Sequence, residues 1–309
     1  MDKGLKYLIV GTGGTGGAVG AYMARAGFDV SFIARGGHLK AIKDKGLRVI
    51  RPNDEFTVNP VKAYDADSYE EKPDVIFVCV KGYSVEGILP LLKRISDENT
   101  VIIPILNIFG TGGSLAKHFS GPLVTDGCIY VASQIEAPGC IRMNGDILRV
   151  VFGVRKKEEY REILKDIEND LKESGIDGIL SDNIARDALL KFSYVSPQGA
   201  CGLFYDVPAG GIQKPGEIRD CFITLIKEID ALADAMDIHF EEDIVSRNLN
   251  ILDALSEKTT TSLQRDVAAG RDSEIDGLIY EVVRLGNEYG VPVPEYEKIA
   301  SELKKRQQG

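Results

Sequence analysis

The sequence lacks tryptophan altogether and has only three histidines among its 309 residues. None of the three lies in a segment typical of a catalytic dyad with serine or cysteine. The five cysteines are widely spaced and no C-x-x-C pair occurs, so neither a zinc site nor a disulfide framework is indicated. We interpret the cysteines as small buried thiols in a reducing compartment.

Long hydrophobic runs and an excess of basic residues are also missing. The first apolar run ends at Gly11 after only a few residues, which is too short for a signal peptide or a membrane span. Lysine and arginine total 37 against 47 aspartates and glutamates, for a formal net charge of −10. This balance argues against nucleic acid as a partner, although a local basic cluster can still bind an anionic substrate. We expect a cytoplasmic protein that binds neither membrane nor nucleic acid.

The first half of the chain alternates strands with helices. Near-continuous apolar runs at 75–80 (VIFVCV) and 101–106 (VIIPIL) are typical of strands buried on both faces of a parallel sheet. Other segments predict strands at 7–10, 30–34, 123–131 and 148–152 and a helix over 18–26. The pattern predicts a doubly wound α/β domain, with the last two strands as an antiparallel extension of its sheet.

The second half has the 3.6-residue period of helices from residue 184 onward. Its apolar stripes comprise Phe222, Ile226, Ile229, Leu232, Ala233 and Met236, and then Leu278, Val282, Leu285 and Tyr289. With 309 residues the chain is long enough for two domains, and we place them at 1–180 and 181–309. The stripes suffice to bury a core and can equally supply the surface of a homodimer.

The segment LIVGTGGTGG at 8–17 contains the G-x-G-x-x-G pattern directly between a predicted strand and a predicted helix. Gly11 permits the turn, Gly13 lets the backbone approach a pyrophosphate, and Gly16 lets the helix pack close to the sheet. The cofactor-binding residues predicted here are Gly11, Thr12, Gly13, Gly14, Thr15 and Gly16. A P-loop is excluded because no Lys-Ser/Thr pair follows, so the alternative is a plain glycine-rich turn. The context favours a Rossmann-type dinucleotide site.

The end of the second strand distinguishes between dinucleotides. NAD sites usually place Asp or Glu about 20 residues beyond the motif to bind the ribose hydroxyls. Here Ala34 and Arg35 occupy that place. A planar guanidinium suits a 2′-phosphate, so Arg35 indicates NADP rather than NAD. The missing acid also disfavours S-adenosylmethionine, and a solvated surface arginine is the alternative interpretation.

Two further polar residues follow predicted strands. Lys81 in VCVKGYSV and Asn107 in ILNIFGTGG lie at carboxyl ends, where ligands bind in such sheets. Lys81 would add a second cation for the 2′-phosphate, and Asn107 could bond to the cofactor or the substrate. Each can otherwise be an ordinary polar residue that closes a strand.

Several motifs together make the chain similar to the ketopantoate reductase (2-dehydropantoate 2-reductase) family over nearly its full length. They are GTGGTG, Arg35, VKGYS at Lys81, LN at Asn107, APGCIRMNG, SLQRDVAAGRDSEIDG and GVPVPEYEKI. The resemblance implies an NADPH-binding domain followed by a helical domain like the C-terminal one of 6-phosphogluconate dehydrogenase. It also implies reduction of a 2-oxo acid ketone to the 2-hydroxy acid, as in 2-dehydropantoate to pantoate in pantothenate biosynthesis.

The resemblance further implies roles for three residues. Lys191 in DALLKFSYV matches the family's general acid, Glu274 matches the glutamate that pairs with this lysine, and Ser262 matches a serine that binds the substrate carboxylate. Hydride delivery to a ketone leaves charge on oxygen, which a positioned lysine can stabilise and protonate. Without the resemblance, Lys191 would be interpreted as a helix-surface cation and Glu274 as a structural ion-pair partner.

The chain departs from the family pattern after Lys191. Asparagines usually follow this lysine at four residues, at eight residues and further on, and the corresponding residues here are Val195, Gly199 and about Ala209. The tryptophan usual before the lysine is also missing. Polar substitutes lie nearby at Ser193, Ser196 and Gln198, and we take Ser196 as a substrate-binding candidate. Because a pocket built to bind a hydroxyl loses much of its selectivity without its donors, a different, less polar 2-oxo acid or ketone is an alternative substrate to ketopantoate.

Two other functions stay open at this point. One is a β-hydroxy acid dehydrogenase-like reductase, which shares the domain layout and the catalytic lysine. The E-I-D segment and Arg35 favour the ketopantoate reductase interpretation over this one. The other is a non-catalytic NADP-binding sensor that kept the fold and lost the pocket, an interpretation motivated by the missing asparagines.

Overall fold

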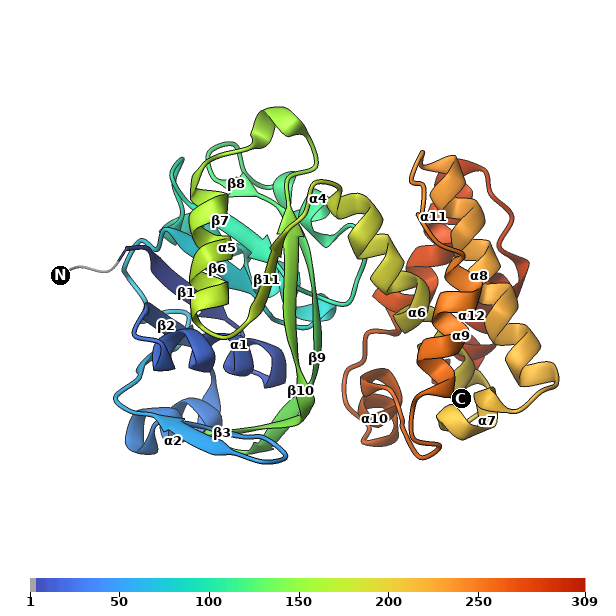
Figure 1. Cartoon of the computed structure of the whole chain (residues 1–309), viewed down its shortest axis with the longest axis horizontal. Helices are drawn as coiled ribbons and strands as arrows, with labels where there is room; N and C mark the ends of the chain where they lie inside the picture. Colours follow the sequence, from blue (N-terminus) through green and yellow to red (C-terminus); the bar gives the residue numbers. More distant parts are fainter. Residues whose placement is uncertain (1–3, 309) are drawn as a thin grey trace. The chain divides into compact units, whose positions relative to one another are not determined.

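The computed structural model describes residues 4–308, which form two compact units (Figure 1). The first unit comprises the chain up to Leu106 together with Gly110–Ile184, and the second comprises Asn107–Phe109 and the chain from Ala185 onward. The short segment Asn107–Phe109 therefore leaves the α/β unit and joins the helical one. None of the helices in the described part of the chain combines the length and the apolar character that crossing a membrane requires.

The first unit is built on a six-stranded parallel sheet in the order β5-β2-β1-β6-β7-β8. Its strands are β1 (Lys6–Val10), β2 (Asp29–Ile33), β5 (Lys62–Tyr64), β6 (Val75–Val78), β7 (Val101–Pro104) and β8 (Leu123–Val124). The central strands β1, β6 and β7 are almost wholly buried, which explains their continuous apolar runs. Because β1 lies between β2 and β6, its carboxyl end is the switch point where ligands bind in such sheets.

The predicted antiparallel strands are present, but they belong to a second sheet and do not extend the first. The second sheet has the order β11-β10-β3-β4, with β9 also paired to β10. Its strands are β3 (Leu47–Ile50), β4 (Glu55–Val58), β9 (Asp126–Ala137), β10 (Cys140–Gly153) and β11 (Asp177–Leu180). The single strand expected at 123–131 divides at Thr125, because β8 ends the first sheet and β9 begins a long antiparallel ribbon with β10. The Asp126-Gly127 dipeptide that follows Thr125 is typical of turns, but the strand predicted over 123–131 ran across it.

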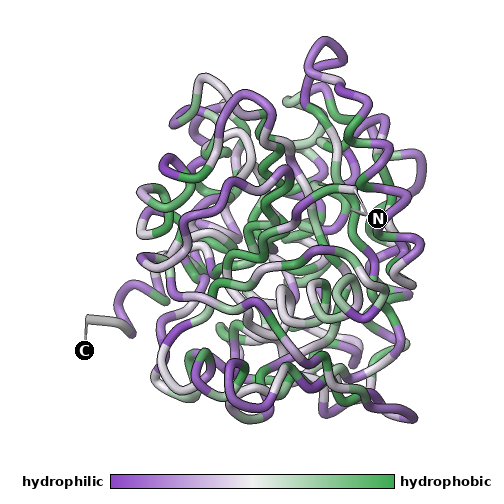
Figure 2. Tube along the Cα trace, turned by 90° about the vertical axis from the view of Figure 1, so that its left-hand side faces the viewer, coloured by the Kyte–Doolittle hydropathy of each residue, from purple (hydrophilic) through white to green (hydrophobic). Residues whose placement is uncertain are grey.

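Helix α1 (Gly14–Arg25) packs against both sheets of this unit, which explains its small residues. A Cβ at Gly20 would lie 2.4 Å from the ring of Phe32 in β2, and one at Gly17 would lie 2.7 Å from Ile141 in β10. The remaining helices of the unit are α2 (Gly36–Lys45), η1 (Gly82–Ser84), α3 (Val85–Ile95), α4 (Thr111–Ala116), η2 (Lys157–Glu159) and α5 (Ile163–Glu173). Hydrophobic segments, green in Figure 2, alternate along the chain with hydrophilic turns, coloured purple.

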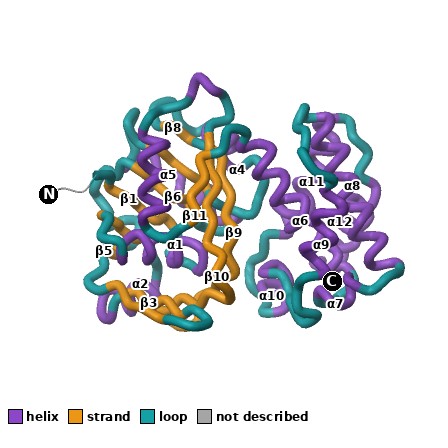
Figure 3. Tube along the Cα trace, viewed as in Figure 1, coloured by secondary structure: helices purple, strands orange, loops and turns teal. Residues whose placement is uncertain are grey.

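The second unit consists of helices and connecting loops (Figure 3). Its elements are α6 (Ile184–Phe204), α7 (Ala209–Gln213), α8 (Glu217–Ala235), α9 (Ile244–Asp253), α10 (Ser262–Ala268), a π-helical turn (Asp276–Tyr280), α11 (Glu281–Tyr289) and α12 (Pro294–Gln308). The predicted stripe from Phe222 to Ala233 is buried on α8, whereas Tyr289 of the second stripe is exposed. Glu228 of α8 accepts hydrogen bonds from the amides of Glu295 and Tyr296 and so satisfies the first turn of α12.

Candidate active site

The glycine-rich turn after β1 is tied to the end of β2 by three hydrogen bonds to one carbonyl. The amides of Gly11 and Thr12 donate to the oxygen of Ile33 at 3.3 and 3.1 Å, and Thr12 Oγ1 donates to it at 2.9 Å. Gly11 has φ +100°, a conformation that favours glycine, and a Cβ there would lie 2.9 Å from the amide nitrogen of Val80. The turn is therefore fixed relative to both neighbouring strands.

The other glycines of the motif have different surroundings. A Cβ at Gly16 would lie 2.3 Å from the oxygen of Gly11, and one at Gly14 would lie 2.8 Å from the backbone of β9 at Ser133. A Cβ at Gly13 would meet no protein atom within 4 Å. Gly13 is also the N-cap of α1, which has no side-chain cap and no acidic residue in its first turn. The uncapped amides at this end of α1 therefore suit a pyrophosphate group.

Arg35 and Lys81 lie at the carboxyl ends of the two strands that flank β1. Arg35 is the N-cap of α2, and its exposed side chain makes no hydrogen bond or ion pair with another residue of the described chain. Lys81 is the N-cap of η1, directly after Val80, which approaches Gly11. Both residues thus lie at the sheet edge that the turn occupies, while their contact with a 2′-phosphate stays a prediction.

Lys191 is a buried cation of the second unit. Its Nζ donates a 2.6 Å hydrogen bond to Oδ1 of Asn107, and only 7% of the residue is exposed. Lys191 lies in the second turn of α6, while Asn107 comes from the short segment that follows β7 and belongs to the same unit. The ligand contact expected for Asn107 stays a prediction, whereas the structure shows its hydrogen bond to the candidate general acid.

Ser262 begins α10 in the same unit, and Glu274 follows this helix. Glu274 is buried, with 5% of its surface exposed, and its main-chain oxygen accepts from the amide of Leu278. Ser262 is the first residue of α10 and is half-buried. Thr261 precedes it as the N-cap and forms a reciprocal capping box with Gln264. This cap holds the start of α10 in place, so Ser262 has a defined position.

The structure corrects the prediction that Ser196 contacts the substrate. Ser196 is fully buried, and its Oγ donates to the oxygen of Leu278 at 2.5 Å and lies 2.6 Å from the hydroxyl of Tyr296. It joins α6 to two other elements of the helical core and leaves no free hydroxyl. Ser193 is likewise buried and is bonded to Asn248. Ser196 was predicted from its proximity to Lys191 in the sequence, which does not show which side of α6 faces the core.

The side of α6 that carries Lys191 continues through Val195 and Gly199, which lie four and eight residues further on. A Cβ at Gly199 would lie 3.1 Å from Cδ2 of Leu263, and Leu263 is 2% exposed. The space beside Gly199 is therefore filled by an apolar side chain of α10. This packing shows how the chain accommodates the missing side chain at this position.

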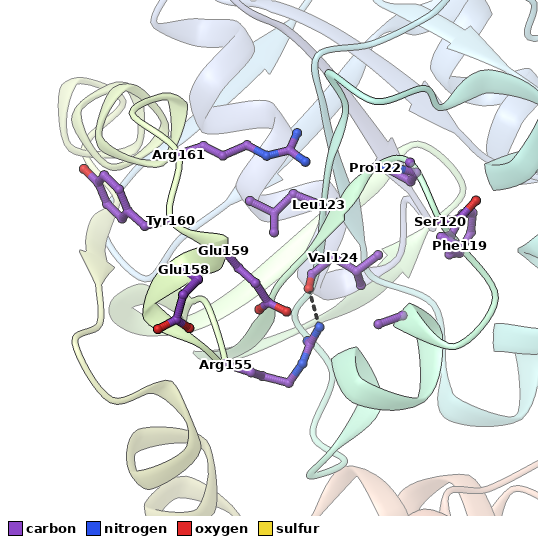
Figure 4. Close-up of a pocket in the computed structure, with 12 residues that line it drawn as sticks. Phe119, Ser120, Pro122, Leu123, Val124, Arg155, Glu158, Glu159, Tyr160 and Arg161 are labelled. Atoms are coloured by element: carbon purple, nitrogen blue, oxygen red, sulfur yellow. Dashed lines mark hydrogen bonds between the residues drawn. The ribbon is translucent and has the colours of Figure 1, made fainter.

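One cavity of about 490 Å³ lies within the first unit but includes no residue of the glycine-rich turn (Figure 4). Its walls include Leu123, Glu159 and two arginines. Arg155 donates to the oxygen of Val124 at 2.8 Å, and Arg161 donates to the oxygen of Glu98 at 2.5 Å. Because both guanidinium groups bond to main-chain carbonyls, we regard them as supports of the sheet edge.

The cysteines and acidic residues offer no metal centre in the part of the chain that the structure describes. No group of three or more His, Cys, Asp or Glu side chains that could hold a metal ion occurs there. All five cysteines are free thiols. Cys201 and Cys221 lie 3.7 Å apart between their sulfurs, and their mutual hydrogen bond and burial raise the pKa of Cys201.

His38 was given no role by the sequence patterns. The structure places it in the first turn of α2, three residues after Arg35. Its Nδ1 accepts a 3.0 Å hydrogen bond from the amide of Gly139 in the β9–β10 turn. The only signal in the sequence was its proximity to Arg35, which does not indicate a contact with a residue 101 positions away.

Comparison with known proteins gives consistent matches over both units. Residues 7–157 match the family described as "Ketopantoate reductase PanE/ApbA", and residues 183–307 match "Ketopantoate reductase PanE/ApbA C terminal". The chain is 26% identical to a 2-dehydropantoate 2-reductase of Aquifex aeolicus, covering 98% of this chain and 97% of that protein. It is 24% identical to the uncharacterized oxidoreductase YkpB of Bacillus subtilis, covering 97% and 98% respectively. Among solved structures, 2-dehydropantoate 2-reductase from Geobacter metallireducens is similar with a TM-score of 0.90 and 25% identity, covering 98% of this chain and 100% of that one.

Proposed function

Because this chain belongs to the ketopantoate reductase PanE/ApbA family, we propose that it reduces the ketone of 2-dehydropantoate, or of a related 2-oxo acid, with NADPH. The protein is an oxidoreductase with a Rossmann-type first unit. The observation that carries the proposal is the buried side chain of Lys191, which lies in the half of the chain that matches the family's C-terminal part. Asn107 accepts a hydrogen bond from this side chain and so holds it in place. In this function the enzyme works in pantothenate biosynthesis and yields pantoate.

The residues of the first unit fit a dinucleotide. The open surface at Gly13 and the uncapped amides of α1 suit its pyrophosphate, with Thr12, Gly14 and Thr15 completing the turn. Arg35, whose side chain no described residue engages, would form a bidentate contact with the 2′-phosphate of NADPH. Lys81 would add a second positive charge at the same edge. When bound, the nicotinamide supplies the hydride.

Lys191 is the proposed general acid. Its ammonium carries three donor hydrogens, and the amide oxygen of Asn107 engages one of them without neutralising the charge. The ammonium would also bond to the ketone oxygen, stabilise the negative charge that develops there and supply the proton. We further propose that Glu274 helps to order Lys191 and that Ser262 binds the substrate carboxylate. The product is the 2-hydroxy acid.

The decisive experiment is to follow the loss of NADPH absorbance with a panel of 2-oxo acids that includes 2-dehydropantoate. Turnover of 2-dehydropantoate supports the proposal, and turnover of another member only would redirect it to a related substrate. Tight NADPH binding without turnover of any member would overturn the enzymatic proposal in favour of a sensor. Turnover of β-hydroxy acids alone, in the reverse direction, would favour a β-hydroxy acid dehydrogenase-like enzyme.

Two properties of the whole protein are also proposals. We propose a cytoplasmic location, supported by the five free thiols. We propose a homodimer as well, since one structural neighbour is a dimeric ketopantoate reductase from Staphylococcus aureus. Sedimentation of the purified protein at several concentrations would test the dimer.

A further inference from the structure

His38 lies in the first turn of α2, directly after the connection that contains Arg35. It links this turn to the tip of the β9–β10 ribbon. Its Nδ1 accepts from the amide of Gly139 at 3.0 Å. Its Nε2 is buried and has no hydrogen-bond partner among the described residues. An Nδ1 that accepts must lack a proton, so the neutral ring carries its hydrogen on Nε2. Burial lowers the pKa of His38, while the nearby main chain of Thr12 acts in the opposite direction.

The ribbon that His38 contacts reaches both parts of the proposed cofactor site. Its tip residue Gly139 has φ +76°, and a Cβ there would lie 3.1 Å from the Cβ of Ala41 in α2. Further along the ribbon, the β9 backbone at Ser133 lies so close to Gly14 that a Cβ on that glycine would come within 2.8 Å. The ribbon therefore packs against the starts of both α1 and α2.

The starts of α1 and α2 must keep a fixed separation if one dinucleotide contacts both of them. The turn is tied to β2 through the oxygen of Ile33, but Ala34 and Arg35 follow as a short connection to α2. Ala34 is buried and its amide donates to the oxygen of Tyr64 at 3.0 Å. Arg35, Gly36 and Gly37 are exposed, and a Cβ at either glycine would meet no atom within 4 Å, so packing supports the connection at Ala34 but gives little support from Arg35 to Gly37. The amide of Leu39 donates to the oxygen of Arg35 within the first turn of α2, and the His38–Gly139 hydrogen bond ties this turn to another element.

We infer that His38 is a positioning residue for the adenosine half of the cofactor, holding the Arg35 loop in register with the glycine-rich turn. The inference rests on the proposed function, because it takes NADPH as the ligand of the glycine-rich turn and Arg35. The 2′-phosphate is the group that Arg35 would bind, so a displaced loop weakens binding of NADP⁺ more than that of NAD⁺. His38 acts through Arg35 and the main chain, so the hydride-transfer step itself is unaffected.

The test compares His38→Leu with His38→Asn by direct titration of NADP⁺ and NAD⁺ in the absence of substrate. Leucine keeps the apolar bulk and loses the acceptor, so we expect the Kd for NADP⁺ to rise about 10-fold and that for NAD⁺ less than about 3-fold. Asparagine places Oδ1 near the position of Nδ1 and should restore the Kd for NADP⁺ to within about 3-fold of wild type. His118→Leu, at an exposed position of the same unit, is the matched control.

The outcomes separate this inference from the proposed function. Equal changes in the two Kd values for His38→Leu, or no restoration by His38→Asn, would overturn the positioning role. Because the titrations need no turnover, they stay informative even if the panel of 2-oxo acids gives none. Thermal unfolding of each variant shows whether the leucine variant is folded, and the asparagine variant keeps the test open if it is not.

Discussion

The ammonium of Lys191 donates a 2.6 Å hydrogen bond to Oδ1 of Asn107, a residue 84 positions earlier in the chain. Asn107 lies shortly after the end of β7, yet it belongs to the helical unit. The amide oxygen of Asn107 accepts this bond without adding a negative charge beside the ammonium, and the bond restricts the rotamers of Lys191. The relationship thus joins a strand end of the first half to the proposed acid of the second.

Replacing Lys191 by methionine tests the general acid. The apolar stem is kept while the donor is lost, so kcat should fall by about 10²–10⁴-fold with an unchanged Kd for NADPH. Steady-state kinetics and a cofactor titration provide the two measurements. Lys214→Met, at an exposed position of the same unit, should behave as wild type. A full rate in Lys191→Met would remove this lysine from the reaction.

Replacing Arg35 by alanine tests the choice of dinucleotide. Loss of the guanidinium should raise the KM for NADPH by about 10- to 100-fold, since charge-assisted bonds to phosphate are worth about 1.5–3 kcal/mol. The KM for NADH should change little, because that cofactor has no 2′-phosphate. Lys40→Ala, which removes an exposed cation of α2, is the control. Equal losses with both cofactors would place Arg35 away from the 2′-phosphate.

Alanine at Gly13 should impair cofactor binding, whereas alanine at Gly16 should impair stability. Gly13 has open space for a Cβ, so Gly13→Ala should fold with an unchanged Tm and lose NADPH affinity where the cofactor approaches. A Cβ at Gly16 would lie 2.3 Å from the oxygen of Gly11, so Gly16→Ala should cost at least about 2 kcal/mol of stability. Thermal unfolding and cofactor titration distinguish the two variants. Tight cofactor binding by Gly13→Ala would contradict the pyrophosphate assignment.

The Glu168 carboxylate makes the stability of the first unit depend on pH. Burial acts to raise its pKa, but hydrogen bonds from Lys165, Lys172 and the amide of Leu180 outweigh this and hold the pKa at about 2, below the usual 4.5. The ionised form is therefore favoured by folding, and its contribution is complete above about pH 4.5 and is lost as the pH falls towards 2.

Glu168→Gln should accordingly lower the free energy of unfolding at pH 7 by about 1–2 kcal/mol, discounted because both lysines are half-exposed. The difference from wild type should shrink as the pH falls below 4.5. Urea unfolding at several pH values measures both effects, with exposed Glu173→Gln as the control. A difference that is constant with pH would show that the ionised carboxylate is not responsible.

The fold could be predicted where the sequence carries local signals. Apolar runs indicated β1, β2, β6 and β7, and the period of 3.6 indicated the helical second unit. The antiparallel pairing of β9 with β10 was predicted, but their place in a second sheet was not, because the other partners come from distant segments and β3 and β4 are short. The split at Thr125 follows from pairing with β7 on one side and β10 on the other, which hydrophobic pattern alone does not specify.

The candidate site divides in the same way. Local patterns indicated the turn and Arg35, and family resemblance indicated Lys191, Glu274 and Ser262. The resemblance did not reveal that the hydroxyl of Ser196 is hydrogen-bonded within the helical core. Which side of α6 is buried depends on the elements that pack against this helix.

A Rossmann-type turn, an arginine in place of the usual acid, and a helical second half all follow from the sequence alone. These features depend on backbone conformation and side-chain chemistry within a few consecutive residues, so they can be predicted from the sequence. That Asn107 holds Lys191 and that His38 accepts from Gly139 depended instead on the tertiary structure, because these contacts join residues 84 and 101 positions apart. Such contacts arise from the packing of whole elements, so no local pattern encodes them.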